Sequence, residues 1–127
     1  MNVQLNHTIV WCRDKHASSR FLTGLLELPP PTPFGAMLVV ALDNRVSLDF
    51  YEQAGEIRSQ HYAFLIDEAG FDRVLARLRE RGLPHWADPG TRPVRVERNG
   101  CSDWQAVLVI VIVFAASGMA RGIGAPG

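Results

Sequence analysis

The sequence predicts an α+β protein that contains a diverged internal duplication of a β-α-β-β-type module. Two segments, one starting near residue 3 and the other near residue 61, each place a strand-like run before an amphipathic helix and further β-rich sequence. An offset of 54 residues aligns His7 with His61. With 127 residues, the chain is expected to form a single domain, with modules at about 1–55 and 56–127.

The first strand is predicted over residues 3–11, where large or apolar side chains occupy the odd positions and polar ones most of the even positions. This alternation places His7 on the face that carries the large apolar residues, including Trp11. Asp14 is then a candidate N-cap for a helix with apolar residues at helical spacing. The helix is expected to end at Leu28, before a block of prolines.

A proline-rich linker is predicted over residues 29–35. Two β-rich runs follow, 37–42 and 46–51, joined by a short polar turn, and this pattern predicts an antiparallel pair. A third β-type run, 61–66, leads into a helix with apolar residues at i, i+3, i+4 and i+7. A glycine and a proline end that helix, so the second module also begins with a strand and a helix.

Composition and charge exclude several classes of protein. Thirteen basic side chains balance thirteen acidic ones, so we expect neither a nucleic acid nor a membrane as partner. The most apolar run, 106–116, is about half of the roughly 20 residues that a membrane-spanning helix needs, and its β-branched residues predict a buried strand. Only two cysteines are present and the first residues lack a secretory pattern, so a cytoplasmic location is expected.

Several motifs follow one another in the order of a known superfamily. They are LNHTIV at 5–10, ASSRFL at 17–22, VSLDF at 46–50, QHYAFL at 60–65 and RERGLPHWADP at 79–89. Together they resemble the vicinal oxygen chelate superfamily, which holds glyoxalase I, bleomycin resistance proteins, fosfomycin-resistance transferases and extradiol dioxygenases. The resemblance implies two βαβββ-like modules forming an open curved mixed sheet with helices outside. It also implies a homodimer and a divalent metal ion in the cleft.

The resemblance implies that the first strand of each module supplies a metal ligand, which assigns this role to His7 and His61. Two imidazoles suit Fe, Mn, Zn or Ni, and a carboxylate would complete the ligand set. In the family a glutamate from a C-terminal hairpin does so, but Gly122 occupies that position here. Alternation puts Asp49 and Glu52 on opposite strand faces. We expect Glu52 to be the third ligand, because it closes the last strand of the first module.

Three explanations for the missing glutamate stay open. The site has lost its metal, the ligand comes from elsewhere in the chain, or the tail after about Pro93 is not the family's native ending, for example through a frameshift. His7 also has an alternative role, as a hydrogen-bonded histidine of the core. The matching position of His61 favours ligation or direct substrate contact for both.

Aromatic side chains near the expected cleft are candidate contacts for a flat or apolar ligand. They are Trp11, Phe50, Tyr62 and Trp86, and their alternative role is in the core. The predicted function is a divalent-metal-dependent lyase, isomerase or dioxygenase acting on a small oxygen-chelating molecule. The alternative is a metal-free dimeric protein of the same fold that sequesters a small molecule or antibiotic. The general base is not assigned.

Overall fold

The computed structural model describes residues 1–58, 60–83, 85–86, 105–112 and 123–124; for His61, 85–86, 105–112 and 123–124 it describes the backbone alone. The elements in chain order are β1 (His7–Cys12), α1 (Lys15–Leu26), β2 (Thr32–Phe34), β3 (Met37–Ala41), β4 (Ser47–Glu52), β5 (Gln60–Asp67), α2 (Glu68–Glu80), β6 (His85–Trp86), β7 (Gln105–Ile112) and β8 (Ile123–Gly124). Two compact units divide them: the first contains β1 to β4 with α1, and the second contains β5 to β8 with α2.

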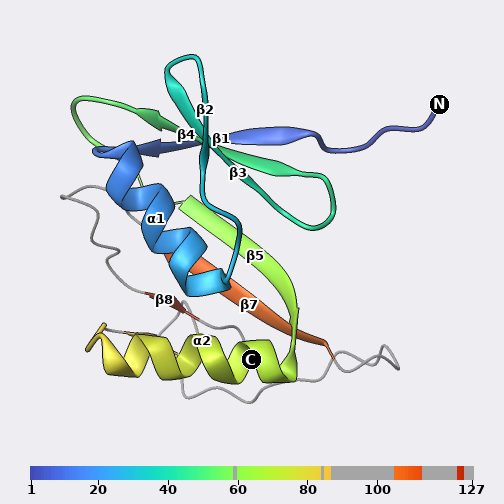
Figure 1. The fold of residues 1–127 in the computed structure, drawn as a ribbon, viewed down its shortest axis with the longest axis vertical. Coiled ribbons are helices and arrows are strands. Elements are labelled where there is room, and N and C mark those ends of the chain that lie inside the picture. The colour runs from blue at the N-terminus through green and yellow to red at the C-terminus, as the bar shows by residue number, and fades with distance from the viewer. Residues whose placement is uncertain (59, 84, 87–104, 113–122, 125–127) are drawn as a thin grey trace. The chain divides into compact units, whose positions relative to one another are not determined.

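The first unit is a four-stranded open sheet in the order β1-β4-β3-β2, with α1 between its first two strands in the chain (Figure 1). β1 runs parallel to β4, whereas β3 is antiparallel to both β4 and β2, so the sheet is mixed. A parallel pair needs a crossover connection, and α1 is part of it. The predicted α+β class is confirmed, and so is the predicted antiparallel pairing of the two runs that became β3 and β4.

The helix α1 begins where the sequence predicted. Asp14 has extended backbone angles and its carboxylate accepts hydrogen bonds from the backbone N–H groups of His16 and Ala17, each at 3.0 Å. The helix ends at Leu26, two residues earlier than expected, because Glu27 adopts a left-handed conformation with φ 55°. Asp14 therefore fixes one end of α1 and the turn at Glu27 the other.

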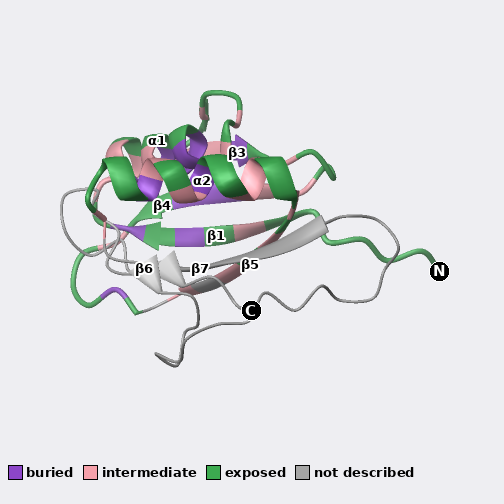
Figure 2. Ribbon diagram, turned by 90° about the horizontal axis from the view of Figure 1, so that it is seen from below, coloured by how far each residue is buried: buried purple, intermediate pink, exposed green. Residues whose placement is uncertain are grey.

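One face of this sheet packs against α1 and forms the core of the first unit. Leu22 and Leu25 of α1 are buried there, and buried residues concentrate where α1 meets β3 and β4 (Figure 2). The sheet contributes alternate residues, as period-2 geometry requires. They are Val10 and Cys12 of β1, Leu38 and Val40 of β3, and Leu48 and Phe50 of β4.

The prediction of a proline-rich linker over residues 29–35 is wrong in part, because Thr32–Phe34 form the edge strand β2. Pro33 lacks a backbone N–H and is tolerated in β2 because an edge strand leaves one side unpaired. Gly35 follows with φ +56°, a left-handed conformation that favours glycine, and closes the tight connection to β3. The strand was not predicted because the prolines of this segment are typical of a linker.

The second unit contains the strand and helix that the sequence predicted, over slightly longer ranges. In α2, Val74 and Leu78 are buried, and Asp67 caps the helix by accepting a hydrogen bond from the Gly70 N–H at 2.6 Å. β5 pairs antiparallel with β7, which opposes His61 to Val111, and β6 pairs parallel with β8. Residues 106–112 of the apolar run are thus a strand, while its predicted burial lies outside the described residues. The second βαβββ module stays a prediction, because residues 87–104 and 113–122 are not described.

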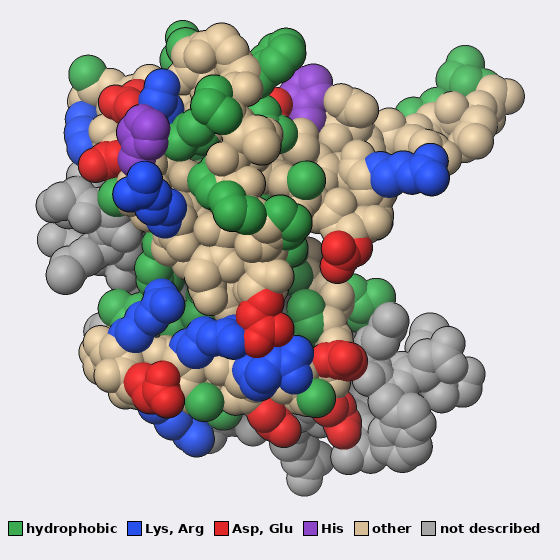
Figure 3. All heavy atoms as spheres, in the orientation of Figure 1, with side chains coloured by type: hydrophobic (Ala, Val, Ile, Leu, Met, Phe, Trp, Pro, Cys, Tyr) green, Lys and Arg blue, Asp and Glu red, His purple; other side chains and the backbone are tan. Residues whose placement is uncertain are grey.

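The surface of α2 carries charges of both signs, with arginines interspersed among aspartates and glutamates (Figure 3). This mixture is typical of a solvated helix face rather than an anion-binding surface. Within the described part of the chain, neither helix is long and apolar enough to cross a membrane.

Candidate functional site

The side of the first unit's sheet opposite α1 collects most of the chemically informative side chains of this unit. We call it the Trp11 face. Strand alternation and pairing register assign its members. They are His7, Ile9 and Trp11 of β1, Ser47, Asp49 and Tyr51 of β4, Met37, Val39 and Ala41 of β3, and Thr32 and Phe34 of β2.

Aromatic and apolar groups gather toward one end of the Trp11 face. Trp11 opposes Tyr51 in the parallel register, and their rings meet edge to face with centroids 5.3 Å apart and planes at 86°. Trp11 and Tyr51 are 39% and 38% exposed, so solvent reaches both rings. Phe34 opposes Met37 and is itself 69% exposed. The end of the face near these residues offers apolar area to a ligand.

His7 lies on the same face, on the same strand as Trp11, and is exposed. The alternative role of a core histidine is therefore wrong. Its ring Nδ1 donates to the side-chain oxygen Oδ1 of Asn6 at 2.7 Å, because this amide oxygen can only accept. This bond engages Nδ1 and leaves Nε2 as the ring nitrogen open to a metal, and a metal-binding imidazole commonly has its second nitrogen held by a neighbour in this way.

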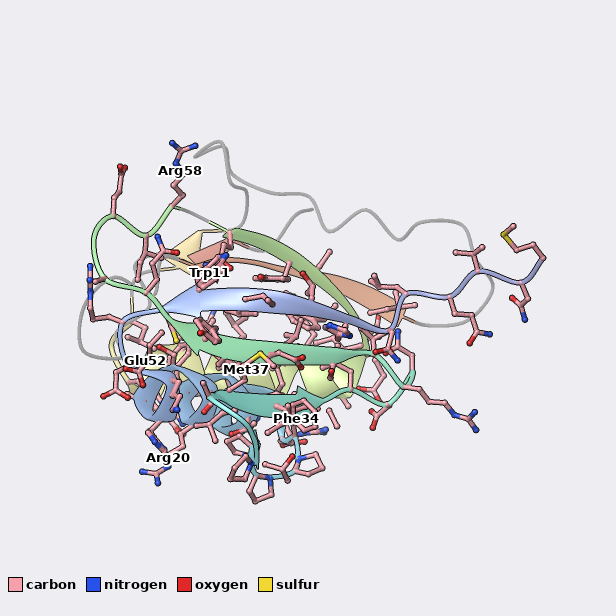
Figure 4. The ribbon with its side chains drawn as sticks, turned by 90° about the horizontal axis from the view of Figure 1, so that it is seen from above. Trp11, Arg20, Phe34, Met37, Glu52 and Arg58 are labelled. Carbon is pink, nitrogen blue, oxygen red and sulfur yellow. The ribbon has the colours of Figure 1, made fainter. Side chains whose placement is uncertain are left out.

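The two carboxylates proposed as third ligand lie on opposite faces of the sheet. Asp49 opposes Ile9 and belongs to the Trp11 face, with His7, where the Ser47 hydroxyl donates to its Oδ1 at 2.8 Å. Glu52 opposes Cys12 and belongs to the face of α1. Figure 4 shows Glu52 on the side of α1 and Trp11 on the other side of β1. The structure thus brings Asp49, rather than Glu52, to the face of His7.

Asp49 is 6% exposed, which is unusual for a carboxylate. The hydrogen bond from Ser47 satisfies one of its lone pairs and fixes its orientation. Within the described part of the chain, no cluster of three or more His, Cys, Asp or Glu side chains forms a complete metal centre.

The predicted aromatic contacts fall in different places. Phe50 is fully buried on the α1 face, so it belongs to the core and does not reach the Trp11 face, because its neighbours Asp49 and Tyr51 point the other way. Tyr62 lies on β5 of the second unit, where its hydroxyl donates to the Gln60 side chain at 2.8 Å and burial raises its pKa. His61 lies next to it on β5, and Trp86 lies on β6.

Cys12, at the end of β1, is fully buried beneath the sheet on the α1 face. Its Sγ donates to the Tyr51 carbonyl at 3.6 Å. Burial raises the pKa of the thiol to about 11, and the carboxylates of Glu52 and Asp14 add to the effect, while the Ser18 side chain and the Lys15 ammonium oppose it. A thiol held in its neutral form is a poor nucleophile.

Sequence reasoning missed three residues that shape this site. Asn6 orients the His7 ring, and its position directly before a strand histidine was the available signal. Phe34 was missed because the surrounding prolines suggested a linker, whereas Met37 was placed in a strand but not in the site. The short Phe-Gly-Ala-Met connection, with a glycine between two apolar residues, was the signal for a hairpin there.

Searches against family models and against curated proteins give no match. Among solved structures, the chain is similar to oxidase ChaP-H1, with 42% sequence identity and a TM-score of 0.76, covering 99% of this chain and 97% of that one. It is also similar to oxidase ChaP-H2, with 41% identity and a TM-score of 0.72, covering 94% of this chain and all of that one. The chain belongs to the same family as these two oxidases.

Proposed function

We propose that this protein is a metal-dependent oxidase of the vicinal oxygen chelate type, which acts on a small aromatic molecule with two neighbouring oxygen atoms. The observation that carries the proposal is the 42% identity to an oxidase over 99% of the chain. An oxidase name favours the dioxygenase type over the lyase and isomerase types that the sequence left open. Fold alone would not separate these reactions, because one fold hosts many.

In this proposal, His7 and His61 hold a divalent ion, each as the first-strand ligand of its module. The donor chemistry fits at His7, where the bond to Asn6 leaves Nε2 as the binding atom. For the third ligand we take Asp49 in preference to Glu52, because Asp49 shares the Trp11 face with His7. An ion bound by two histidines and a carboxylate supplies Lewis acidity to the substrate oxygens and, if it is iron, one-electron chemistry toward dioxygen.

The chain's own groups have separate roles in this scheme. Asn6 holds the His7 ring by accepting a hydrogen bond from its Nδ1–H, so the ring does not need to reorient when a ligand arrives. Ser47 donates to Asp49 and keeps one carboxylate oxygen engaged. Trp11 and Tyr51 supply flat apolar area beside these polar groups, which is the usual composition of a small-molecule site.

Metal analysis on protein purified without a histidine tag tests the proposal. We expect stoichiometric iron, manganese, nickel or zinc in the wild type and its loss in both His7→Ala and His61→Ala. His16→Ala is the matched control, since His16 is exposed on α1 and outside the Trp11 face. Loaded protein should consume dioxygen when given catechols. A wild type that binds none of the four metals after soaking would refute the metalloenzyme.

The second candidate is a metal-free dimer that sequesters an aromatic or antibiotic-like molecule. The exposed rings of Trp11 and Phe34 favour it, because they offer apolar area without requiring any metal. The same experiment separates the two functions. If the protein binds an aromatic ligand at Trp11 but contains no metal and consumes no dioxygen, the result would support this second candidate.

A further inference from the structure

A single side chain in the short link between β1 and α1 reaches the segment that leaves the first unit. Arg13 Nη1 donates to the Gln53 carbonyl at 3.2 Å, and its Nη2 donates to the Gly55 carbonyl. The two acceptors are separated from Arg13 by 40 and 42 positions in the sequence. A guanidinium fits this arrangement because its donors form a rigid planar fork that can serve two acceptors at once.

The segment that Arg13 holds, residues 53–58, is neither helix nor strand, yet it has further anchors. The Gln53 N–H donates to the Cys12 carbonyl at 2.9 Å, and the Gln53 side chain donates to the Glu56 carbonyl at 3.1 Å. Ile57 is only 6% exposed. Gly55 has φ +88°, a conformation that other residues rarely adopt. The segment therefore follows one defined course.

This course matters because the segment is the direct covalent connection between β4 and β5. The first unit's continuous stretch ends at Arg58, and β5 begins at Gln60 with His61 as its second residue. Residues 53–58 are therefore the last stretch of the first unit before the strand that carries His61.

We propose that Arg13 is a positioning residue that clamps residues 53–58 against the end of β1 and so sets the course on which the chain leaves the first unit. The two carbonyls it binds lie within three residues, so losing the guanidinium releases the segment at two points. The backbone bond from Gln53 to Cys12 then holds only its first residue.

Limited trypsin digestion measures the release, because Arg58 is exposed at the end of the clamped segment (Figure 4). In Arg13→Ala, the initial rate of cleavage after Arg58 should rise about tenfold, since cleavage follows the population of the open segment. Mass spectrometry identifies the fragment that ends at Arg58. Cleavage within α2 serves as the internal reference. Arg13→Lys should fall between wild type and alanine, because an ammonium has no planar fork to bind both carbonyls.

Lys15→Ala is the matched control. Lys15, at the start of α1, also donates to a backbone carbonyl through its side chain. Its acceptor is the Ala36 carbonyl at 2.9 Å, which lies in the β2–β3 connection and not in residues 53–58. Lys15→Ala should leave cleavage after Arg58 unchanged. Wild-type cleavage in Arg13→Ala, or an equal rise in Lys15→Ala, would overturn the proposal. If Arg13→Ala unfolds at a lower urea concentration than wild type, the cleavage rate of Arg13→Lys is compared with that of wild type instead.

A second readout rests on the metal site proposed above. If the clamp directs His61, Arg13→Ala should bind Co(II) several-fold more weakly than wild type, with a changed visible absorption spectrum. Equal affinity and an equal spectrum would overturn a role in positioning His61. A wild type that does not bind Co(II) would refute the metal site, and the proteolysis result would then decide the clamp alone.

Discussion

Trp11 and Tyr51 oppose each other on neighbouring parallel strands, with their rings edge to face at 5.3 Å and 86°. Each ring restricts the other, although neither is buried. Side chains that are already ordered lose less conformational entropy when a ligand binds. This pair is therefore a prepared apolar surface on the face that also carries His7.

Trp11→Ala should weaken binding of a planar catechol by about tenfold, because aromatic contacts contribute roughly 0.5–1.5 kcal/mol beyond the area they bury. Isothermal titration calorimetry measures the change without relying on tryptophan fluorescence. Phe50→Leu is the control, since Phe50 lies on the α1 face and should leave the affinity unchanged. Equal catechol affinity in wild type and Trp11→Ala would mean that the ligand binds elsewhere.

Phe50 should matter more than Trp11 for stability, although Trp11 should matter more for catechol binding. Phe50 is fully buried, so Phe50→Ala should lower the free energy of unfolding by about 3–5 kcal/mol. Trp11 is 39% exposed, and its removal should cost less, about 1–2 kcal/mol, because partly exposed side chains leave smaller cavities. Urea unfolding of both variants checks the order. A larger loss for Trp11→Ala than for Phe50→Ala would contradict the assignment of faces.

Local signals in the sequence were sufficient for most of the first unit. Asp14 before an apolar-periodic run predicted the start of α1, and two β-rich runs around a polar turn predicted β3 and β4. The strand β2 was missed because its proline is acceptable only at an edge, and edge position is a property of the whole sheet.

The site was harder to predict than the fold, because periodicity sorts residues into two faces but does not say which face the helix covers. His7 and Trp11 were correctly grouped, yet Glu52 was preferred to Asp49 because it ends a strand. Only the pairing of β1 with β4 shows that Asp49 shares the face of His7. The hydrogen bond from His7 to the Asn6 side chain and the bonds from Arg13 to two carbonyls depend on side-chain geometry, which strand periodicity alone does not give.

The two carboxylates should respond differently to removal of their charge. Asp49→Asn should lower metal affinity about tenfold or more, because it removes an anionic ligand candidate on the face of His7. Glu52→Gln should leave it unchanged, since Glu52 lies on the α1 face. Competition with a chromophoric chelator measures both constants under the same conditions. A loss of affinity in Glu52→Gln alone would restore Glu52 as the third ligand and reject Asp49.

The buried thiol of Cys12 should make stability depend on pH in the alkaline range. Folding raises the pKa of this thiol from 9.0 to about 11, chiefly by burial, so the folded state holds the proton more tightly than the unfolded chain. Below pH 9 both states are protonated and the contribution to stability is complete. Between pH 9 and 11 the unfolded chain ionises first, and the free energy of unfolding falls.

Urea unfolding of wild type and Cys12→Ala between pH 7 and 10.5 measures this contribution. The alanine variant should be less stable at pH 7, because it leaves a small cavity, but its stability should fall less steeply above pH 9. The raised pKa of Tyr62 is present in both proteins and cancels in the comparison. Parallel curves for the two proteins would show that the Cys12 thiol ionises alike in the folded and unfolded states.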